Sequence, residues 1–136
     1  MSIYWEDLVS WSSKKQNSVA LSTGEAEYIS AGSCCAQLLW MRSTLSDFGI
    51  NVKQVPLLCD NESAIKMTNN PVQHSRTKHI DIKHHFLRDH ETKGAIALSH
   101  VSTDKQLADI FTKPFDEKRF YFLRSELNIL DSCNLA

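Results

Sequence analysis

The chain has 136 residues, of which 42% are hydrophobic, so it can bury one modest core. Its 15 Lys and Arg nearly balance 16 Asp and Glu, and overall charge therefore gives no evidence for a nucleic-acid partner. Because no apolar run approaches the roughly 20 residues that span a bilayer, and the N-terminus lacks the signal-peptide pattern, we expect an intracellular protein, cytoplasmic or nuclear. Residues 1–130 are expected to form one partial domain, followed by a tail at 131–136.

Strands and helices alternate in the first half of the predicted structure. A strand is predicted at Leu8–Trp11. A long helix is predicted from Ser22, which forms a capping box with Glu25, to Gly49, because apolar residues recur at helical spacing between them. The apolar run Val55–Cys59 then predicts a buried strand that leads into Asp60.

The second half continues this alternation. A short helix is predicted at Glu62–Thr68 and an amphipathic helix at Thr77–Thr92, which Gly94 ends. A strand at Ala95–Val101 follows, and two more helices are predicted at 105–113 and 115–130, separated by Pro114. The order of the elements predicts an α/β fold whose crossovers lead onto one sheet.

The four cysteines match neither a disulfide framework nor a CxxC zinc pattern. Cys34 and Cys35 are adjacent, Cys59 stands in an apolar run, and Cys133 lies in the polar tail. We expect reduced, mostly buried thiols.

Three carboxylates occupy positions that suit chemistry. Glu27 lies four residues before Ala31 on the apolar face of the long helix, so its carboxylate is expected to face the sheet instead of solvent. Asp60 follows a buried strand directly, at the end where open α/β sheets bind ligands. Asp109 lies in the predicted helix after the last strand. Convergence of the three would hold two divalent metal ions ~4 Å apart for phosphodiester hydrolysis, and hard Mg²⁺ prefers such oxygen ligands.

Ordinary structural roles stay open for the same three residues. Asp60 could cap the helix that follows it, and Asp109 could be solvated on a helix flank. Glu27 could pair with a buried Lys or Arg.

A basic, histidine-rich segment lies between His74 and Lys93 and contains five of the six histidines. We expect it to contact the phosphates of a nucleic-acid duplex through four side chains: Arg76, Lys78, His79 and Lys83. Two alternatives stay open. The segment could be a solvated helix face, or His84 or His85 could join Cys59 in a zinc site, although a four-ligand spacing is lacking.

Several strings in one order carry a more specific signal than any single residue. They are Trp11–Gln16, Val19–Thr23, Glu25–Ile29, Cys59–Asn61, Ser63–Ile65, Asn70–Val72, Arg76–Ile82, His85–Phe86 and Ala108–Lys113. Together they resemble the ribonuclease H region of copia-type retrotransposon Pol polyproteins, from about Leu8 to Leu130.

The resemblance implies a ribonuclease H-like mixed sheet with flanking helices and cleavage of the RNA strand of an RNA–DNA hybrid by two Mg²⁺ ions. Glu27, Asp60 and Asp109 match three of the family's four metal-binding acids. The fourth is an aspartate on the first strand, which is expected upstream of residue 1 together with most of the second strand. An RNA–DNA hybrid and the reverse transcriptase portion of the parent polyprotein are the implied partners. The alternative is a catalytically inactive, retroelement-derived remnant that binds nucleic acid or a protein.

Overall fold

The computed structural model describes residues 2–4, 8–17, 19–69 and 78–130, with the backbone alone described at 2–4 and 78–84. These residues form two compact units: one comprises residues 1–15 and 105–136, and the other residues 16–104. Each unit is described by itself. The predicted tail at 131–136 lies outside the described residues.

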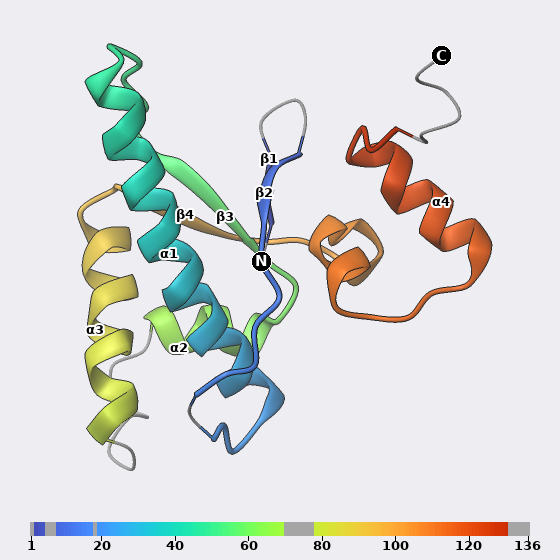
Figure 1. Ribbon diagram of the computed structural model, residues 1–136. Helices are drawn as coiled ribbons and strands as arrows, with labels where there is room; N and C mark the ends of the chain where they lie inside the picture. The colour runs from blue at the N-terminus through green and yellow to red at the C-terminus, as the bar shows by residue number, and fades with distance from the viewer. Residues whose placement is uncertain (1, 5–7, 18, 70–77, 131–136) are drawn as a thin grey trace. The chain divides into compact units, whose positions relative to one another are not determined.

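The larger unit, residues 16–104, contains three α-helices and a parallel pair of strands among its described residues (Figure 1). In chain order these elements are α1 (Thr23–Asp47), β3 (Val55–Cys59), α2 (Glu62–Asn69), α3 (Lys78–Thr92) and β4 (Ile96–His100). All five predicted elements in this stretch are confirmed, with ends that differ by one or two residues.

Helix α1 begins where the capping box predicts. The Ser22 side chain accepts a hydrogen bond from the backbone N–H of Glu25 at 3.1 Å, and the Glu25 carboxylate accepts one from the N–H of Leu21. At the other end Gly49 adopts a φ of 79°, a left-handed conformation that glycine enters without a Cβ penalty. Local chemistry therefore sets both ends of the longest helix.

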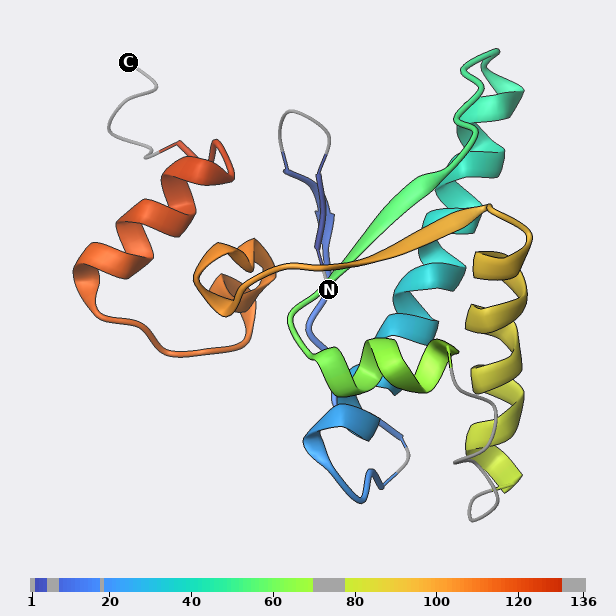
Figure 2. The same cartoon turned by 180° about the vertical axis from the view of Figure 1, so that it is seen from behind.

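Strands β3 and β4 pair in parallel, with a register that runs from Val55 opposite Ile96 to Cys59 opposite His100. The helices cover one face of this sheet, as the opposed views of Figures 1 and 2 show. Leu57, Cys59 and Ile96 are buried on the covered face, whereas Leu58 on the other face is 41% exposed. This alternation follows the two-residue period of a strand.

The core of the larger unit lies between the sheet and α1. Helix α1 contributes most of it, and α2, α3 and the strands complete it; the buried apolar residues are Tyr28, Ile29, Ala31, Cys34, Cys35, Leu38, Leu57, Cys59, Ala64, Leu87 and Ile96. The expectation of reduced, buried thiols is confirmed for three cysteines, Cys34, Cys35 and Cys59. Cys133 lies outside the described residues.

The smaller unit contains an antiparallel hairpin of β1 (Ser2–Tyr4) and β2 (Leu8–Trp11), the 3₁₀ helix η3 (Leu107–Phe111), and α4 (Glu117–Glu126). The Trp11 and Phe111 rings stack at 4.8 Å, and Leu123 and Leu127 of α4 are buried. Strand β2 and helix α4 confirm the predictions at 8–11 and 115–130.

Two expectations about this region are wrong. The described strands form two separate two-stranded sheets, because β2 pairs with the three-residue strand β1 that the sequence pattern did not reveal. The predicted helix at 105–113 is instead a 3₁₀ turn at Thr103–Lys105 followed by η3. Gln106, which precedes η3, makes no side-chain cap, so this segment lacks the hydrogen bond that begins α1 and α4, and Pro114 prevents a helix from continuing beyond it.

No helix among the described residues is long and apolar enough to cross a membrane.

Candidate functional site

Asp60 stands directly after β3, at the carboxyl edge of the parallel sheet. The neighbouring strand ends at the same edge, because His100 is in register with Cys59 and the Val101 N–H donates to the Cys59 carbonyl at 3.0 Å. Parallel strands place their carboxyl ends together, and this is the edge at which α/β sheets bind ligands.

Helix α2 is capped by Asn61 and not by Asp60. The Asn61 Oδ1 accepts hydrogen bonds from the backbone N–H groups of Ser63 at 3.0 Å and Ala64 at 3.1 Å. The alternative role for Asp60 as the cap of this helix is therefore wrong.

Glu27 lies within electrostatic reach of the thiol of Cys59, the last residue of β3. Burial raises the pKa of the Cys59 thiol, the hydrogen bond with the Asn61 backbone opposes that rise, and the negative charges of Glu27 and Asp60 raise it further. Both carboxylates thus act on one buried sulfur atom, which is possible only if both lie within electrostatic reach of it. The geometry of the helices agrees, because a Cβ at Gly24 would lie 3.5 Å from the Oδ1 of Asn61, the residue that follows Asp60.

The expectation that Glu27 faces away from solvent is wrong, because its side chain is exposed. At roughly 100° per residue Glu27 does share the helix face of Cys34 and Leu38, and both of these are buried. Glu27 stands two turns closer to the helix N-terminus, beside the point where β3 has already ended in Asp60. Glu27 therefore lies on the helix face that is buried farther along α1, but its own side chain stays exposed to solvent.

Gly24, one turn before Glu27, brings α1 close to α2. A Cβ atom at Gly24 would lie 3.0 Å from the Ser63 Cβ and 3.2 Å from the Met67 Cε, both on α2. Such distances are shorter than nine in ten real Cβ contacts, so a side chain at this position would require the neighbouring atoms of α2 to move. The close approach holds the first turns of α1 against the helix that follows Asp60.

Asp109 belongs to the smaller unit. It is 8% exposed, and its carboxylate forms an ion pair with Lys113 at 2.7 Å. The alternative that Asp109 is merely solvated on a helix flank is therefore wrong. Its expected membership of a metal site stays a prediction, as does any role with Glu27 and Asp60.

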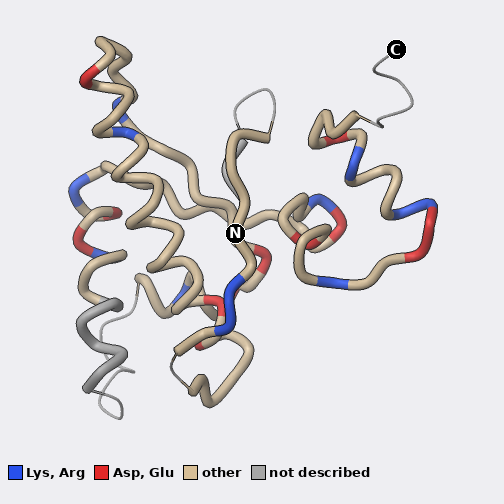
Figure 3. The backbone as a smooth tube through the Cα atoms, viewed as in Figure 1, with Lys and Arg blue, Asp and Glu red and all other residues tan. Residues whose placement is uncertain are grey.

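The four residues expected to bind a nucleic-acid duplex cannot be compared with side-chain positions. Arg76 lies outside the described residues, and Lys78, His79 and Lys83 lie in the part of α3 whose backbone alone is described. In the remainder of α3, acidic and basic residues are interspersed, as Figure 3 shows. That part of the helix presents no continuous basic stripe.

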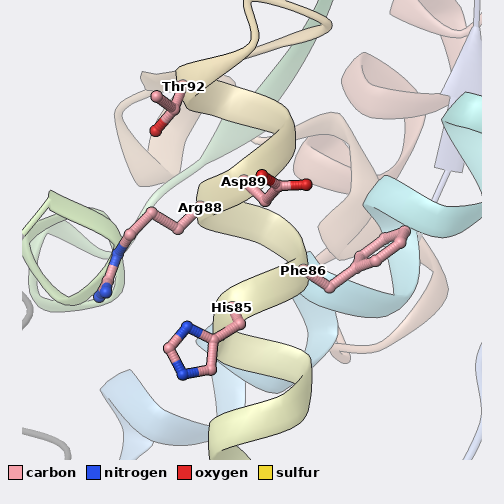
Figure 4. A pocket seen from close by; sticks show the side chains of 5 residues that line it. All are labelled: His85, Phe86, Arg88, Asp89 and Thr92. Carbon is pink, nitrogen blue, oxygen red and sulfur yellow. The ribbon is translucent and has the colours of Figure 1, made fainter.

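Arg88 in this helix has a different role from the one that its charge suggests. Figure 4 shows it at the rim of a pocket on α3 that His85, Phe86, Asp89 and Thr92 also line, with its side chain extended toward α2. The Arg88 guanidinium donates to the backbone carbonyls of Thr68 at 2.8 Å and Met67 at 3.3 Å. These carbonyls are in the last turn of α2, where the backbone carbonyls of a helix need hydrogen-bond donors from outside the regular hydrogen-bond pattern. Arg88 therefore caps the C-terminus of α2.

Within the described residues, no group of three or more Cys, His, Asp or Glu side chains could hold a metal ion. The zinc alternative gains no support from the described His85 and Cys59. A pair of carboxylates is nevertheless a suitable start for Mg²⁺, which commonly takes one or two carboxylates and completes its shell with water and substrate phosphates. Glu27 and Asp60 fit that donor set.

Sequence reasoning missed Gly24, Asn61 and Arg88. The first two carried a local signal: a glycine one helical turn before an acidic residue, and an asparagine at the start of a short helix. Arg88 carried none, because its hydrogen bonds reach back 20 residues to α2. A sequence pattern does not reveal such a long-range contact.

The chain is similar to segments of transposon proteins. Retrovirus-related Pol polyproteins from transposons RE1 and RE2 of Arabidopsis thaliana are 43% and 42% identical over 89% and 90% of the chain. The corresponding polyprotein from transposon TNT 1-94 of Nicotiana tabacum is 38% identical over 82% of the chain. The chain spans 8% of the length of each of these relatives. No family model and no solved structure matches the chain.

Proposed function

We propose that the chain supplies carboxylates to a ribonuclease H site of a retrotransposon Pol polyprotein, which cuts the RNA strand of an RNA–DNA hybrid with Mg²⁺. The observation that supports the proposal is the position of Asp60 directly after β3, at the carboxyl edge of the parallel sheet, beside the first turns of α1 that carry Glu27. The Pol polyprotein relatives support a retroelement origin.

Glu27 and Asp60 would hold Mg²⁺, which when bound lowers the pKa of a water molecule and stabilises charge on the phosphate oxygens. Exposure of Glu27 suits this role, since a phosphodiester must reach the same edge from solvent. Asp109 is proposed as a third acid, and the fourth is expected on a strand that precedes residue 1 in the parent polyprotein. The side chains of Arg76, Lys78, His79 and Lys83 are proposed to contact phosphates of the hybrid.

The test is incubation of the chain with Mg²⁺ and an end-labelled RNA–DNA hybrid, with duplex DNA and duplex RNA in parallel. A second arm uses the chain fused to the segment that precedes the matched region in the RE1 polyprotein. We expect RNA cleavage in the fused protein, with loss of at least 100-fold in Asp60→Asn and Glu27→Gln. Glu62→Gln is the matched control, because it removes a carboxylate that is exposed, pairs with Lys66 and lies two residues from Asp60.

Each outcome decides between two functions. Hybrid binding without cleavage in both arms would support the inactive, nucleic-acid-binding remnant and overturn the ribonuclease. Cleavage that survives Asp60→Asn would show that another site is responsible. A protein that neither binds nor cuts the hybrid would overturn both functions.

A further inference from the structure

A buried polar contact joins the three helices of the larger unit next to the Glu27–Asp60 pair. Tyr28 is 1% exposed and Thr68 is 0% exposed, and their side chains are hydrogen-bonded. Thr68 also donates to the carbonyl of Ala64 at 3.2 Å, and its own backbone carbonyl accepts from Arg88. Tyr28, Thr68 and Arg88 thus link α1, α2 and α3 in one connected set, which we call the helix clamp.

The helix clamp is more than ordinary core packing, because each member satisfies polar groups of another element. Burial raises the pKa of the Tyr28 hydroxyl, and the positive charge of Arg88 and the hydrogen bond with Thr68 oppose that rise. Arg88 donates hydrogen bonds to two backbone carbonyls in the last turn of α2 and brings a positive charge to the negative end of that helix. A buried polar group that loses its hydrogen-bond partner destabilises the fold, so these contacts favour one arrangement of the three helices.

Two contacts fix α1 along α2, and Glu27 lies between them. Gly24 meets Ser63 and Met67 at one end, and Tyr28 meets Thr68 at the other, four residues and about one turn later. Asp60 and the capping residue Asn61 immediately precede α2. A shift of α2 along α1 would therefore change the separation of the Glu27 and Asp60 carboxylates.

We propose that Tyr28, Thr68 and Arg88 are positioning residues that set the spacing of Glu27 and Asp60 for a divalent cation; this rests on the proposed function. None of the three touches the cation. Arg88 holds the far end of α2, Thr68 and Tyr28 hold its contact with α1, and the two carboxylates stand at the near end. Metal sites commonly lose about 10- to 100-fold in affinity when groups that hydrogen-bond to their ligands are removed, and we expect a loss at the lower end of that range because these three residues act on the helices next to the ligands.

The experiment titrates the full chain with Mn²⁺, which stands in for Mg²⁺, and follows free Mn²⁺ by electron paramagnetic resonance. Glu27→Gln and Asp60→Asn define the binding that belongs to the pair. In Arg88→Met and in Thr68→Val we expect that component to weaken roughly tenfold, and in Arg88→Lys by less, because lysine keeps the charge but not the two-pronged donor. Measurements are made well below the unfolding temperature of each variant.

Matched controls separate positioning from general stability. Lys93→Met removes a cation that directly follows α3 and pairs with the exposed Asp89 of that helix. Thr44→Val removes a hydroxyl that bonds to the carbonyl four residues earlier, as Thr68 does, but on α1. Both controls should leave Mn²⁺ affinity within twofold of the parent chain.

The outcomes distinguish this inference from the proposed function. If Glu27-dependent Mn²⁺ binding is present but unchanged in the Arg88 and Thr68 variants, while their unfolding temperatures fall, the clamp is only structural and the inference is overturned. If no Mn²⁺ binding depends on Glu27 and Asp60, the inference is overturned together with the metal pair of the proposed function. Weakened Mn²⁺ binding in the Arg88 and Thr68 variants, together with a fused protein that leaves the hybrid uncut, would uphold the clamp and count against the ribonuclease alone.

Discussion

Substitution of Gly24 by alanine tests how tightly α1 and α2 approach. In an exposed helix the change would stabilise the chain by about 1 kcal/mol, because alanine has the higher helix propensity. At Gly24 the new Cβ would meet the Ser63 Cβ at 3.0 Å and the Met67 Cε at 3.2 Å. Carbon atoms prefer roughly 3.5–4.0 Å, so the Ser63 Cβ must move away by a few tenths of an ångström.

Two opposing effects decide the sign of the change. Overpacking of this kind costs about 1–3 kcal/mol, and the propensity gain offsets only part of that cost. We therefore expect Gly24→Ala to lower the free energy of unfolding by about 1 kcal/mol, measured by urea denaturation followed by circular dichroism. Ala36→Gly, at an exposed position of the same helix, measures the propensity difference without the contact.

A double-mutant cycle with Ser63→Gly isolates the contact itself. Removal of the Ser63 Cβ should relieve the clash, so Gly24→Ala should be about 1–2 kcal/mol less harmful in that background. The flexible end of Met67 can move aside and should contribute little. A Gly24→Ala chain that is more stable than the parent, or effects that simply add in the cycle, would refute the close approach of α1 and α2.

Three further changes should alter stability in predictable directions. Asn61→Ala should lower the free energy of unfolding by about 1 kcal/mol in urea, because α2 loses its cap. Burial raises the pKa of Cys34 and of Cys35 to about 11 from 9.0, so the thiols stay protonated longer in the folded chain. The contribution of these two thiols to the free energy of unfolding should therefore be constant below pH 9. It should fall between pH 9 and about 11, by up to ~1.4 kcal/mol per pH unit for each thiol in reductant. Lys113→Met should cost about 1–3 kcal/mol in thermal unfolding, because it removes the ion-pair partner of the buried Asp109.

Each of these predictions has its own control. Asp60→Asn should leave stability nearly unchanged, and a loss equal to that of Asn61→Ala would mean that both residues cap α2. Cys35→Ala should reduce the alkaline slope by the share of one thiol, and an unchanged slope would assign it to Cys34, Cys59 and Tyr28, whose pKa burial also raises. Lys66→Met removes a pair whose partners are 76% and 68% exposed, so it should cost under about 1 kcal/mol; an equal cost for Lys113→Met would contradict the burial of Asp109.

Local patterns predicted most of the larger unit. The capping box at Ser22 and Glu25 and the glycine at 49 placed both ends of α1, because helix ends are settled by hydrogen bonds and backbone freedom within a few residues. The apolar run at 55–59 likewise predicted β3 and, with it, the position of Asp60. The 3₁₀ helices at 103–105 and 107–111 were missed, because the apolar spacing there also fits an α-helix.

The residues of the candidate site also fall into those that the sequence predicts and those that only the structure reveals. Sequence alone identified Glu27 and Asp60, since the type of residue and its place on a helix or after a strand are local properties. Only the tertiary structure decided that Glu27 is exposed, that Asn61 and not Asp60 caps α2, and that Arg88 faces α2. These properties depend on where a neighbouring element ends and on contacts between residues about 20 positions apart, which packing determines and periodicity does not encode.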